Sequence, residues 1–255
     1  MPSIDHKTAL ITGGSHRIGG HITSALADAG WSVAIHYHGS AEEAEGLAHS
    51  IVAQGGEAIT VGADLSDAGL ASKLISDASK ATGPIGALIN NASLFEAENW
   101  EAVTPGSWAA HMDVNLRAPF FLSQAFAKEL PETSHGSIIN IIDQRIWNLT
   151  PDFMSYTISK SGLWTLTKTL ALALAPRIRV NGIGPGPTLA SKRQDEMAFK
   201  LQSESTPLGH GATPGDIADA VLYLLGATSV TGQMIAVDSG EHLGWVKPTT
   251  DTASQ

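Results

Sequence analysis

Short apolar runs alternate with longer amphipathic stretches along almost the whole chain. The apolar runs are continuous, which is typical of strands buried on both faces of a parallel sheet. Strands are predicted at residues 7–12, 31–37, 57–62, 85–90, 136–142, 177–183 and 234–237. Helices are predicted between them at residues 21–29, 41–54, 67–82, 108–129 and 214–225, with one more that carries Tyr156 and runs to about Ala175.

This alternation predicts an α/β fold, with a single Rossmann-type, doubly wound parallel sheet of about seven strands flanked by helices. No internal repeat or break in composition divides the chain, so residues 1–246 are expected to form one domain. Residues 190–208 are rich in polar side chains and are expected to form a mobile, partly helical lid. Residues 247–255 are expected to form a polar C-terminal tail.

Composition narrows the range of partners. The net charge of −10 argues against nucleic acid or an anionic membrane as the main partner. The chain has no cysteine, which rules out disulfides and thiolate chemistry. No signal peptide pattern opens the chain, and no apolar run reaches the roughly 18 residues that a membrane span needs. A cytoplasmic protein that acts on a small molecule is expected, and no metal ligand is predicted.

The first strand runs into a glycine-rich stretch, GGSHRIGG, that precedes a helix. Glycine lets the backbone turn tightly and approach a pyrophosphate, and a helix N-terminus offers unpaired amides to it. The spacing of Gly13, Arg17 and Gly19 differs from G-x-G-x-x-G, so a plain turn is the alternative.

The end of the second strand, HYHGS, bears on the choice of nucleotide. An acid at this place binds the ribose 2′-hydroxyl of NAD, and none occurs here before Glu42. Its absence favours NADP(H), with Arg17, His38 and Ser40 as donors to the 2′-phosphate. The alternative for His38, and for His36 before it, is an ordinary strand-end residue. Asp64 is expected to receive an adenine amino group, with an N-terminal helix acid as the alternative.

The candidate catalytic groups lie between residues 143 and 160. Tyr156 and Lys160 are four residues apart, so on a helix they share a face. A neighbouring ammonium lowers the pKa of a phenol and suits it to acid-base catalysis, although a surface pair is the alternative. Asp143 follows the apolar run IINII directly. Asn115 lies inside a predicted helix, where its amide competes with the backbone, so a structural contact or a catalytic support role is expected.

Taken together, these motifs resemble the short-chain dehydrogenase/reductase family along almost the whole chain. The motifs stand in that family's order: TGGSHRIG, Asp64-Leu65, NNAS, the helix of Asn115, Tyr156-x-x-x-Lys160, Pro185-Gly186 and VTGQMIAVDSG. Three departures make the chain most similar to pteridine reductases, including the bacterial dihydromonapterin/dihydrofolate reductase branch. Arg17 replaces a glycine, Ser93 and Phe95 occur in NNAS-x-F, and Asp143 replaces the usual serine. The stretch HYHGS also resembles the HYHRS of pteridine reductases, but Gly39 stands in place of their arginine, which weakens the expected binding of the 2′-phosphate.

The resemblance implies an NADP(H) site and a substrate site. The implied cofactor-binding residues are Gly13, Arg17, Ile18, Tyr37, His38, Ser40, Asp64, Leu65, Asn91, Ala92, Ser93, Tyr156, Lys160, Pro185, Gly186 and Thr188. The implied substrate-binding residues are Arg17, Ser93, Phe95, Asp143 and Tyr156, and the implied catalytic residues are Asp143, Tyr156, Lys160 and Asn115. In this picture Asp143 and Tyr156 relay a proton to a pterin nitrogen, and Phe95 stacks on the pterin.

Three functions remain open from the sequence. The first is an NADPH-dependent pteridine reductase, and the second is a short-chain reductase of another carbonyl or imine, in which Asp143 replaces serine for a different substrate. The third is a non-catalytic NADP(H) sensor, which would need neither Tyr156 nor Lys160. Phe95 has the alternative of packing on the lid, and Trp147 is expected either to line the pocket or to pack in the core. The resemblance also implies a homotetramer built through the two long helices.

Overall fold

A seven-stranded parallel sheet forms the centre of the computed structural model, which describes residues 3–190 and 195–244. The strand order is β3-β2-β1-β4-β5-β6-β7. The strands are β1 (Thr8–Ile11), β2 (Ser32–Tyr37), β3 (Ala58–Gly62), β4 (Ala87–Asn90), β5 (Gly136–Ile141), β6 (Ile178–Pro185) and β7 (Met234–Val237). The predicted fold class and number of strands are therefore confirmed.

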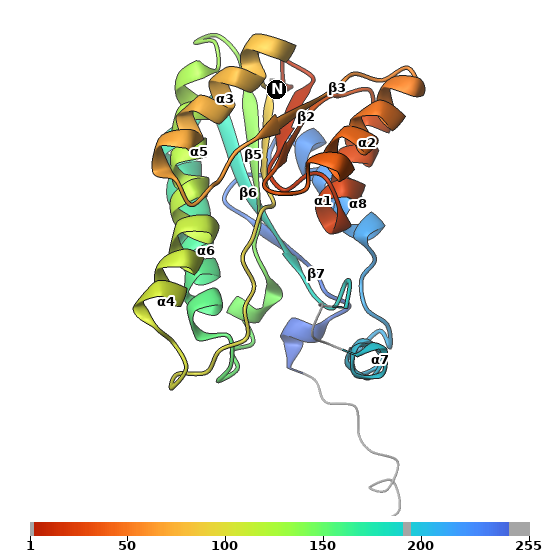
Figure 1. Cartoon of the computed structure of the whole chain (residues 1–255), viewed down its shortest axis with the longest axis vertical. Coiled ribbons are helices and arrows are strands. Elements are labelled where there is room, and N and C mark those ends of the chain that lie inside the picture. The colour runs from red at the N-terminus through yellow and green to blue at the C-terminus, as the bar shows by residue number, and fades with distance from the viewer. Residues whose placement is uncertain (1–2, 191–194, 245–255) are drawn as a thin grey trace, which may run out of the picture.

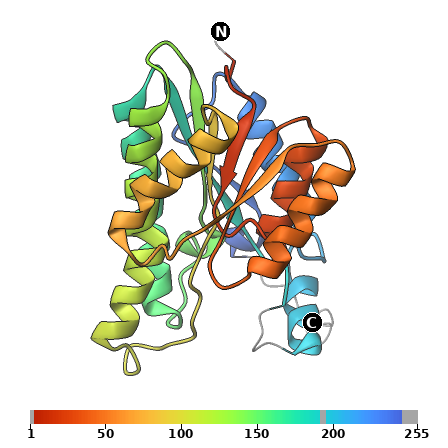
Figure 2. The same ribbon diagram turned by 45° about the horizontal axis from the view of Figure 1, so that its top comes forward.

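Helices cover both faces of the sheet (Figures 1 and 2). On one face lie α1 (Arg17–Asp28), α2 (Ala41–Ala53) and α8 (Pro214–Gly226). On the other lie α3 (Ala68–Thr82), α5 (Ala118–Glu129) and α6 (Met154–Leu174). The remaining helical segments are α4 (Pro105–Met112), the π-helical turn η1 (Asp113–Arg117), α7 (Glu196–Glu204) and two 3₁₀ turns, η2 (Gln144–Ile146) and η3 (Glu241–Leu243).

The core contains two large apolar layers, one on each face of the sheet, and a smaller cluster of Ile142, Leu163 and Met234. Along β1, Ala9 and Ile11 pack under α1 and α8, whereas Leu10 packs under α3 and α5. β4 repeats the division with Ile89 and Leu88. Successive strand residues point to opposite faces, so a strand covered on both sides is expected to be mostly apolar at successive positions. This explains the continuous apolar runs of the sequence.

Two helix starts and one helix interior differ from the sequence prediction. α1 begins at Arg17, four residues before the predicted start at His21. The long helix predicted at 108–129 begins at Pro105, where Thr104 and Ser107 form a capping box. It then passes through a π-helical turn that contains Asn115 before it continues as α5. π-helical turns inside α-helices often occur at functional sites.

In the last third of the chain, the observed boundaries lie closer to the predicted ones. β6 continues to Pro185, two residues past the predicted end, because Pro185 still pairs with Val237 of β7. Part of the predicted lid at 190–208 is helical as α7, but residues 191–194 lie outside the described residues, and its mobility stays a prediction. The predicted tail at 247–255 lies outside them as well. Within 3–190 and 195–244, no helix is long and apolar enough to span a bilayer.

Candidate active site

A cavity of about 1000 Å³ opens at the carboxyl ends of the strands. Its wall comes from the glycine-rich loop after β1, the segment after β4, the η2 turn, the start of α6 and the segment after β6. These segments flank the place where β1 and β4 are neighbours although β2 and β3 follow β1 in sequence. Open α/β sheets bind their ligands at such a switch point.

The glycine-rich loop approaches its neighbours too closely for side chains. Gly13 has φ of +59°, and a Cβ on Gly19 would lie 2.0 Å from the carbonyl oxygen of Gly13. Arg17 begins α1 with φ of +52°. Gly13, Arg17 and Ile18 all line the cavity, as predicted. The closely packed loop therefore presents the N-terminus of α1 to the cavity, as a cradle that suits a phosphate group.

His36 of β2 holds this loop from behind. Its Nδ1 accepts the N–H of Gly13 at 3.1 Å, so the neutral ring donates from Nε2 to the carbonyl of Ala63, also at 3.1 Å. The side chain is 1 % exposed, and this burial lowers the pKa of His36 to about 4. The sequence offered His36 only as an ordinary strand-end residue, whereas the structure makes it the support of the loop.

His36 is expected to make stability depend on pH. The pKa of an unperturbed histidine is about 6.5, so between pH 4 and 6.5 the unfolded chain binds more protons than the folded one. The free energy of unfolding should therefore fall as the pH drops through this window, by up to ~3 kcal/mol. Urea unfolding at pH 7 and pH 4.5 measures the loss.

The matched variants are His36→Asn and His38→Asn. An asparagine at position 36 does not titrate, and its amide oxygen can still accept the N–H of Gly13, so the pH dependence should become shallower. His38 is exposed, and its replacement should leave the slope as in the wild type. Equal slopes for the wild type and His36→Asn would contradict the assignment.

Of the residues predicted for the 2′-phosphate and adenine, Arg17 lines the cavity, and the others lie beyond its lining, around the ends of β2 and β3. His38 Nε2 is 4.0 Å from Asp64 Oδ2, and Ser40 Oγ is 2.9 Å from Ser15 Oγ. Tyr37 packs against Gly62. Asp64 accepts the N–H of Ser66, and hydrogen bonds from that residue lower the pKa of Asp64. The expected contact with adenine stays a prediction for Asp64, as does any cofactor role of Leu65.

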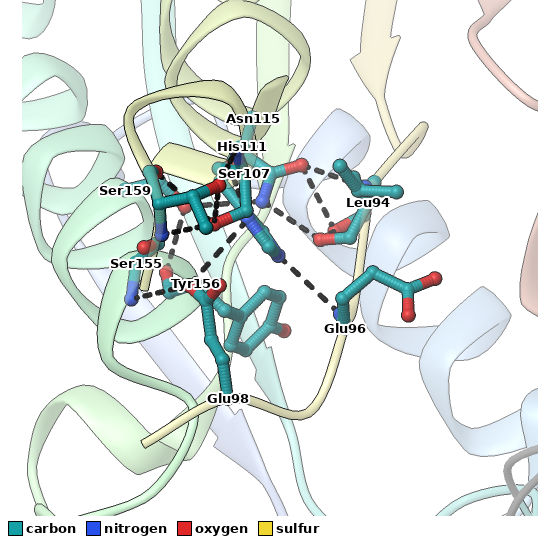
Figure 3. A network of polar contacts seen from close by, with 11 residues as sticks. Leu94, Glu96, Glu98, Ser107, His111, Asn115, Ser155, Tyr156 and Ser159 are labelled. Atoms are coloured by element: carbon teal, nitrogen blue, oxygen red, sulfur yellow. Dashed lines mark hydrogen bonds and ion pairs between the residues drawn. The ribbon is translucent and has the colours of Figure 1, made fainter. Parts of the chain in front are cut away.

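Asn115 fixes the segment after β4. Its Oδ1 accepts from Leu94 N at 2.8 Å and from Ser93 Oγ at 3.2 Å, while Nδ2 donates to Leu94 O and to Ser159 Oγ (Figure 3). Asn115 is fully buried and does not line the cavity. Its amide thus joins the π-helical turn, this segment and α6, which is a positioning task.

Asn91 and Ala92 join the same segment to the glycine-rich loop. Asn91 Nδ2 donates to the carbonyls of Thr12 and Gly13, and Ala92 N donates to Thr12 Oγ1. Both residues line the cavity with Ser93. The segment after β4 is therefore held at both sides of the switch point, as its place at a strand end predicts.

Tyr156, Asp143 and Lys160 meet at the cavity wall. Tyr156 Oη donates to Asp143 Oδ2 at 2.7 Å, and Asp143 Oδ1 accepts the N–H of Arg145 at 2.8 Å. Lys160 is 2 % exposed and donates from Nζ to the carbonyl of Ile141 at 2.8 Å. The lysine Nζ lies 5.7 Å from the centre of the Tyr156 ring. The structure thus brings Tyr156, Lys160 and Asp143 to one place at the cavity, and their catalytic roles stay predictions.

The protonation states differ from the prediction. Lys160 was expected to lower the pKa of Tyr156, but burial and the adjacent Asp143 carboxylate raise that pKa well above its usual range. Burial also raises the pKa of Asp143 and lowers that of Lys160 to about 8. The physical reason is that the buried phenol donates a hydrogen bond to the Asp143 carboxylate, and this negative charge disfavours ionisation of the phenol. Tyr156 therefore stays protonated, and Asp143 becomes the group more easily protonated than usual.

An aromatic wall stands beside this pair. Phe95 stacks on Phe153 with ring centres 4.6 Å apart and an interplanar angle of 5°, and meets the edge of Tyr156 at 4.7 Å. Its contact is thus with Phe153, and its side chain remains 41 % exposed at the cavity. The Arg145 guanidinium lies over the Phe153 ring, 4.8 Å from its centre. Phe153 was absent from the predicted site, because no motif marks it.

The segment after β6 closes another side. A Cβ on Gly186 would lie 2.6 Å from Asp238 Cα, so glycine is required there. Thr188 Oγ1 donates to the carbonyl of Gly186, and Arg17 donates to the carbonyls of Leu189 and Ala190. Pro185, Gly186 and Thr188 line the cavity as predicted. Arg17 therefore links the glycine-rich loop to the segment that leads toward α7.

Glu241 was not predicted but lines the cavity. Its carboxylate accepts from Gln144 Nε2 at 2.8 Å and from Gln202 Nε2 at 3.2 Å. Burial raises the pKa of Glu241, and the nearby Asp143 charge adds to this. These three residues come from segments far apart in sequence, and no spacing pattern could have joined them.

Trp147 fits neither expectation. Its side chain is 42 % exposed and lies against Trp164 and His242, outside both the core and the cavity lining. Within residues 3–190 and 195–244, no group of three histidine or acidic side chains could hold a metal ion. The cavity thus offers one carboxyl-phenol pair, a buried ammonium, an aromatic wall and a phosphate cradle.

Comparison with known protein families agrees with this arrangement. Residues 13–242 match a family model described as Enoyl-(Acyl carrier protein) reductase. Over 249 residues the chain is 36 % identical to an uncharacterised oxidoreductase of Methylorubrum extorquens, covering 94 % of this chain and 99 % of that one. It is 31 % identical over 243 residues to a 3-oxoacyl-[acyl-carrier-protein] reductase of Staphylococcus aureus, covering 93 % and 98 %.

Solved structures give closer matches. The crystal structure of FolM alternative dihydrofolate reductase 1 from Brucella canis, complexed with NADP, superposes with a TM-score of 0.91 at 46 % identity, covering 95 % of this chain and 96 % of that one. A blue fluorescent protein from a metagenomic library, in complex with NADPH, gives 0.85 at 32 % identity, covering 91 % and 96 %. The sheet, the cavity and these similarities together define the family.

Proposed function

Because the chain belongs to the short-chain dehydrogenase/reductase family, we propose that it is an NADPH-dependent pteridine reductase acting on a dihydropterin or dihydrofolate. The observation that carries the proposal is the 2.7 Å hydrogen bond from Tyr156 Oη to Asp143 Oδ2 at the cavity wall. The similarity to FolM alternative dihydrofolate reductases at 46 % identity supports the same substrate class.

The carboxyl group distinguishes C=N from C=O reduction. An ionised aspartate would repel the alkoxide that develops when a carbonyl is reduced. Reduction of a pteridine C=N bond instead needs a proton on the ring nitrogen as hydride reaches the carbon. A general acid works best when its pKa is near the working pH, and burial raises the pKa of Asp143 toward that range. Tyr156 then relays or orients the proton that Asp143 holds.

The residues present fit NADP(H). The glycine-rich loop presents the N-terminus of α1, whose free amides suit a phosphate group, and no acid stands at the end of β2 to repel a 2′-phosphate. Bound NADPH would supply the hydride. Lys160 would hold the nicotinamide ribose, and Thr188 would bind the carboxamide. His38 and Ser40, at the end of β2, would contact the 2′-phosphate.

The substrate would lie between the cofactor and the aromatic wall. Phe95 is the exposed aromatic ring at the cavity and would stack on the flat pterin. Arg17 and Ser93, which also line the cavity, would contact its polar edge. Asp143 and Tyr156 would face the nitrogen that takes the proton. Each of these five roles is a proposal for this chain.

A carbonyl reductase is the second candidate. The similarity to 3-oxoacyl-[acyl-carrier-protein] reductases favours it. In that case Asp143 would serve a different acid-base role. A non-catalytic sensor is disfavoured, since it would need neither the buried Lys160 nor the hydrogen-bonded Tyr156.

One assay separates the two enzymes. NADPH oxidation is followed with dihydrobiopterin, dihydromonapterin and dihydrofolate, and in parallel with a panel of ketones and an acetoacetyl thioester. We expect turnover with at least one pterin and weak activity with the ketones. Good ketone turnover without pterin turnover would refute the pteridine assignment. NADH in place of NADPH tests the cofactor preference, which Gly39 is expected to relax.

The assembly is part of the proposal. A homotetramer through the two long helical stretches, around Asn115 and around Tyr156, would cover apolar side chains that are exposed in the single chain. Phe120 on α5 is 37 % exposed and Leu172 on α6 is 83 % exposed. A cytoplasmic location, with no nucleic acid or membrane as partner, is likewise proposed from composition.

A further inference from the structure

The segment after β4 carries an acid that the proposed reaction does not use. Residues 91–99 have no regular secondary structure for most of their length, and they bring Ser93 and Phe95 to the cavity. Three residues after Phe95, Glu98 turns away from solvent and is only 9 % exposed. A buried carboxylate is costly unless it is hydrogen-bonded or paired. Its partners therefore indicate what it holds.

Glu98 caps the helix that carries Tyr156. The N-cap residue of α6, Phe153, provides no side-chain cap. Instead the carbonyl of Glu98 accepts the N–H of Phe153 at 2.7 Å and of Met154 at 3.4 Å, and its Oε1 accepts the N–H of Ser155 at 3.3 Å. Acceptors at this place satisfy free amides and match the helix dipole. Tyr156 is the next residue.

The charge state of Glu98 suits this task. Burial tends to raise its pKa, but hydrogen bonds from Ser155 and Ser107 act in the opposite direction, and the pKa is lowered. The carboxylate is therefore ionised near neutrality. An ionised acceptor at the start of a helix makes stronger hydrogen bonds than a neutral one.

His111 of α4 braces the segment from its other side. The ring is 1 % exposed. Its Nδ1 is 2.9 Å from the carbonyl of Ser107 and 3.9 Å from Glu98 Oε1, and its Nε2 accepts the N–H of Glu96 at 3.3 Å (Figure 3). A neutral ring with the proton on Nδ1 satisfies both hydrogen bonds. Glu96 and Glu98 are thus tied to α4 around one imidazole.

Phe153 connects these contacts to the aromatic wall. Its backbone has φ of +59° and ψ of +44°, a left-handed conformation that is uncommon for a bulky residue. The hydrogen bond from its N–H to the carbonyl of Glu98 holds this conformation, and its ring stacks on Phe95. Glu98 therefore supports Phe95, which lies on the same segment, through Phe153, and it also supports the turn of α6 that carries Tyr156.

We propose that Glu98, braced by His111, is a positioning residue that fixes the Phe95–Phe153 wall relative to Tyr156. The inference goes beyond the proposed reaction but rests on the assigned role of Tyr156. Loss of the carboxylate would remove the acceptor of the Ser155 N–H and the contact with His111, while the backbone carbonyl of Glu98 would still accept from Phe153 and Met154. The first turn of α6 would then be held less firmly, and the wall and the proton donor would move relative to each other. Misplacement by about 1 Å can cost ~100-fold in rate.

Three variants test this. In Glu98→Ala we expect kcat/KM to fall by about tenfold or more, while the Kd for NADPH changes by less than about twofold, since the phosphate cradle is separate. Glu98→Gln retains an acceptor for the N–H of Ser155 and should recover most of the activity. The control is Asp67→Ala, which removes the N-cap acceptor of α3, away from the cavity.

Hydrogen–deuterium exchange provides a readout that needs no turnover. In Glu98→Ala, amides of 93–98 and of 153–157 should exchange faster together, whereas in Asp67→Ala they should not. Kinetics of Glu98→Ala matching those of Asp67→Ala, or unchanged exchange at 153–157, would overturn the inference. If the wild type reduces ketones and no pterin, the pteridine assignment fails, and the Glu98 variants are then measured with the ketone.

Discussion

Replacement of Tyr156 by phenylalanine is expected to lower turnover by about 10²–10⁴-fold, the usual contribution of a positioned general acid. The variant loses only the hydroxyl that donates to Asp143 at 2.7 Å. The remaining ring keeps its edge contact with Phe95 and its place near Lys160. The cavity wall should therefore persist, and the defect should lie in proton transfer.

NADPH binding distinguishes this defect from a general collapse of the site. Fluorescence titration of Tyr156→Phe should give a Kd within about twofold of the wild type, because the hydroxyl contributes a single hydrogen bond. The matched control is Tyr223→Phe on α8, where the side chain is 59 % exposed, and its activity should be unchanged. Full activity in Tyr156→Phe would remove Tyr156 from the reaction.

Continuous apolar runs were enough to predict the sheet. β7 was predicted at its observed bounds, and the other strands within about two residues. A strand buried on both faces is mostly apolar at successive positions, so its signal is local. Helix starts were less predictable. α1 begins at Arg17, within a glycine-rich stretch whose helix propensity is low. Glycine occurs there because tertiary contacts leave no room for a Cβ at Gly19, so local propensity alone could not indicate the start of the helix.

Site residues at strand ends were predictable for a related reason. Gly13, Asn91 and Asp143 directly follow predicted strands and Gly186 follows one within three residues, and parallel strands bring their carboxyl ends to one edge of the sheet. The family resemblance added their roles. The resemblance could not give protonation states, because the raised pKa of Tyr156 comes from burial and the Asp143 carboxylate acting together.

Contacts between segments that lie far apart in sequence could not be predicted. Glu98 reaches Ser155, 57 residues later, and Gln144 reaches Glu241, 97 residues later. Such contacts depend on how loops fold over the sheet and leave no periodic pattern. Phe153 shows the same limit, since its left-handed backbone is held by Glu98 and not by its own sequence.

Asp143 should be the residue that sets the substrate class. Asp143→Ser is expected to lower pterin reduction by about 10²-fold or more, as loss of a general acid does, and to spare or improve ketone reduction. A serine hydroxyl can donate to a carbonyl oxygen and carries no charge to oppose an alkoxide. Steady-state kcat/KM for a pterin and for a ketone measures the selectivity.

The pH profile gives the second readout for Asp143. Because burial raises the pKa of Asp143, the protonated carboxyl persists to higher pH than in a free aspartate, and kcat for a pterin should fall as pH rises through that raised pKa. Asp143→Asn accepts from Arg145 N but cannot supply the proton, so this limb of the profile should disappear. Asp77→Asn, at an exposed pair with Lys80, is the control and should retain it. An equal loss with every substrate would mean that Asp143 supports Tyr156 without protonating nitrogen.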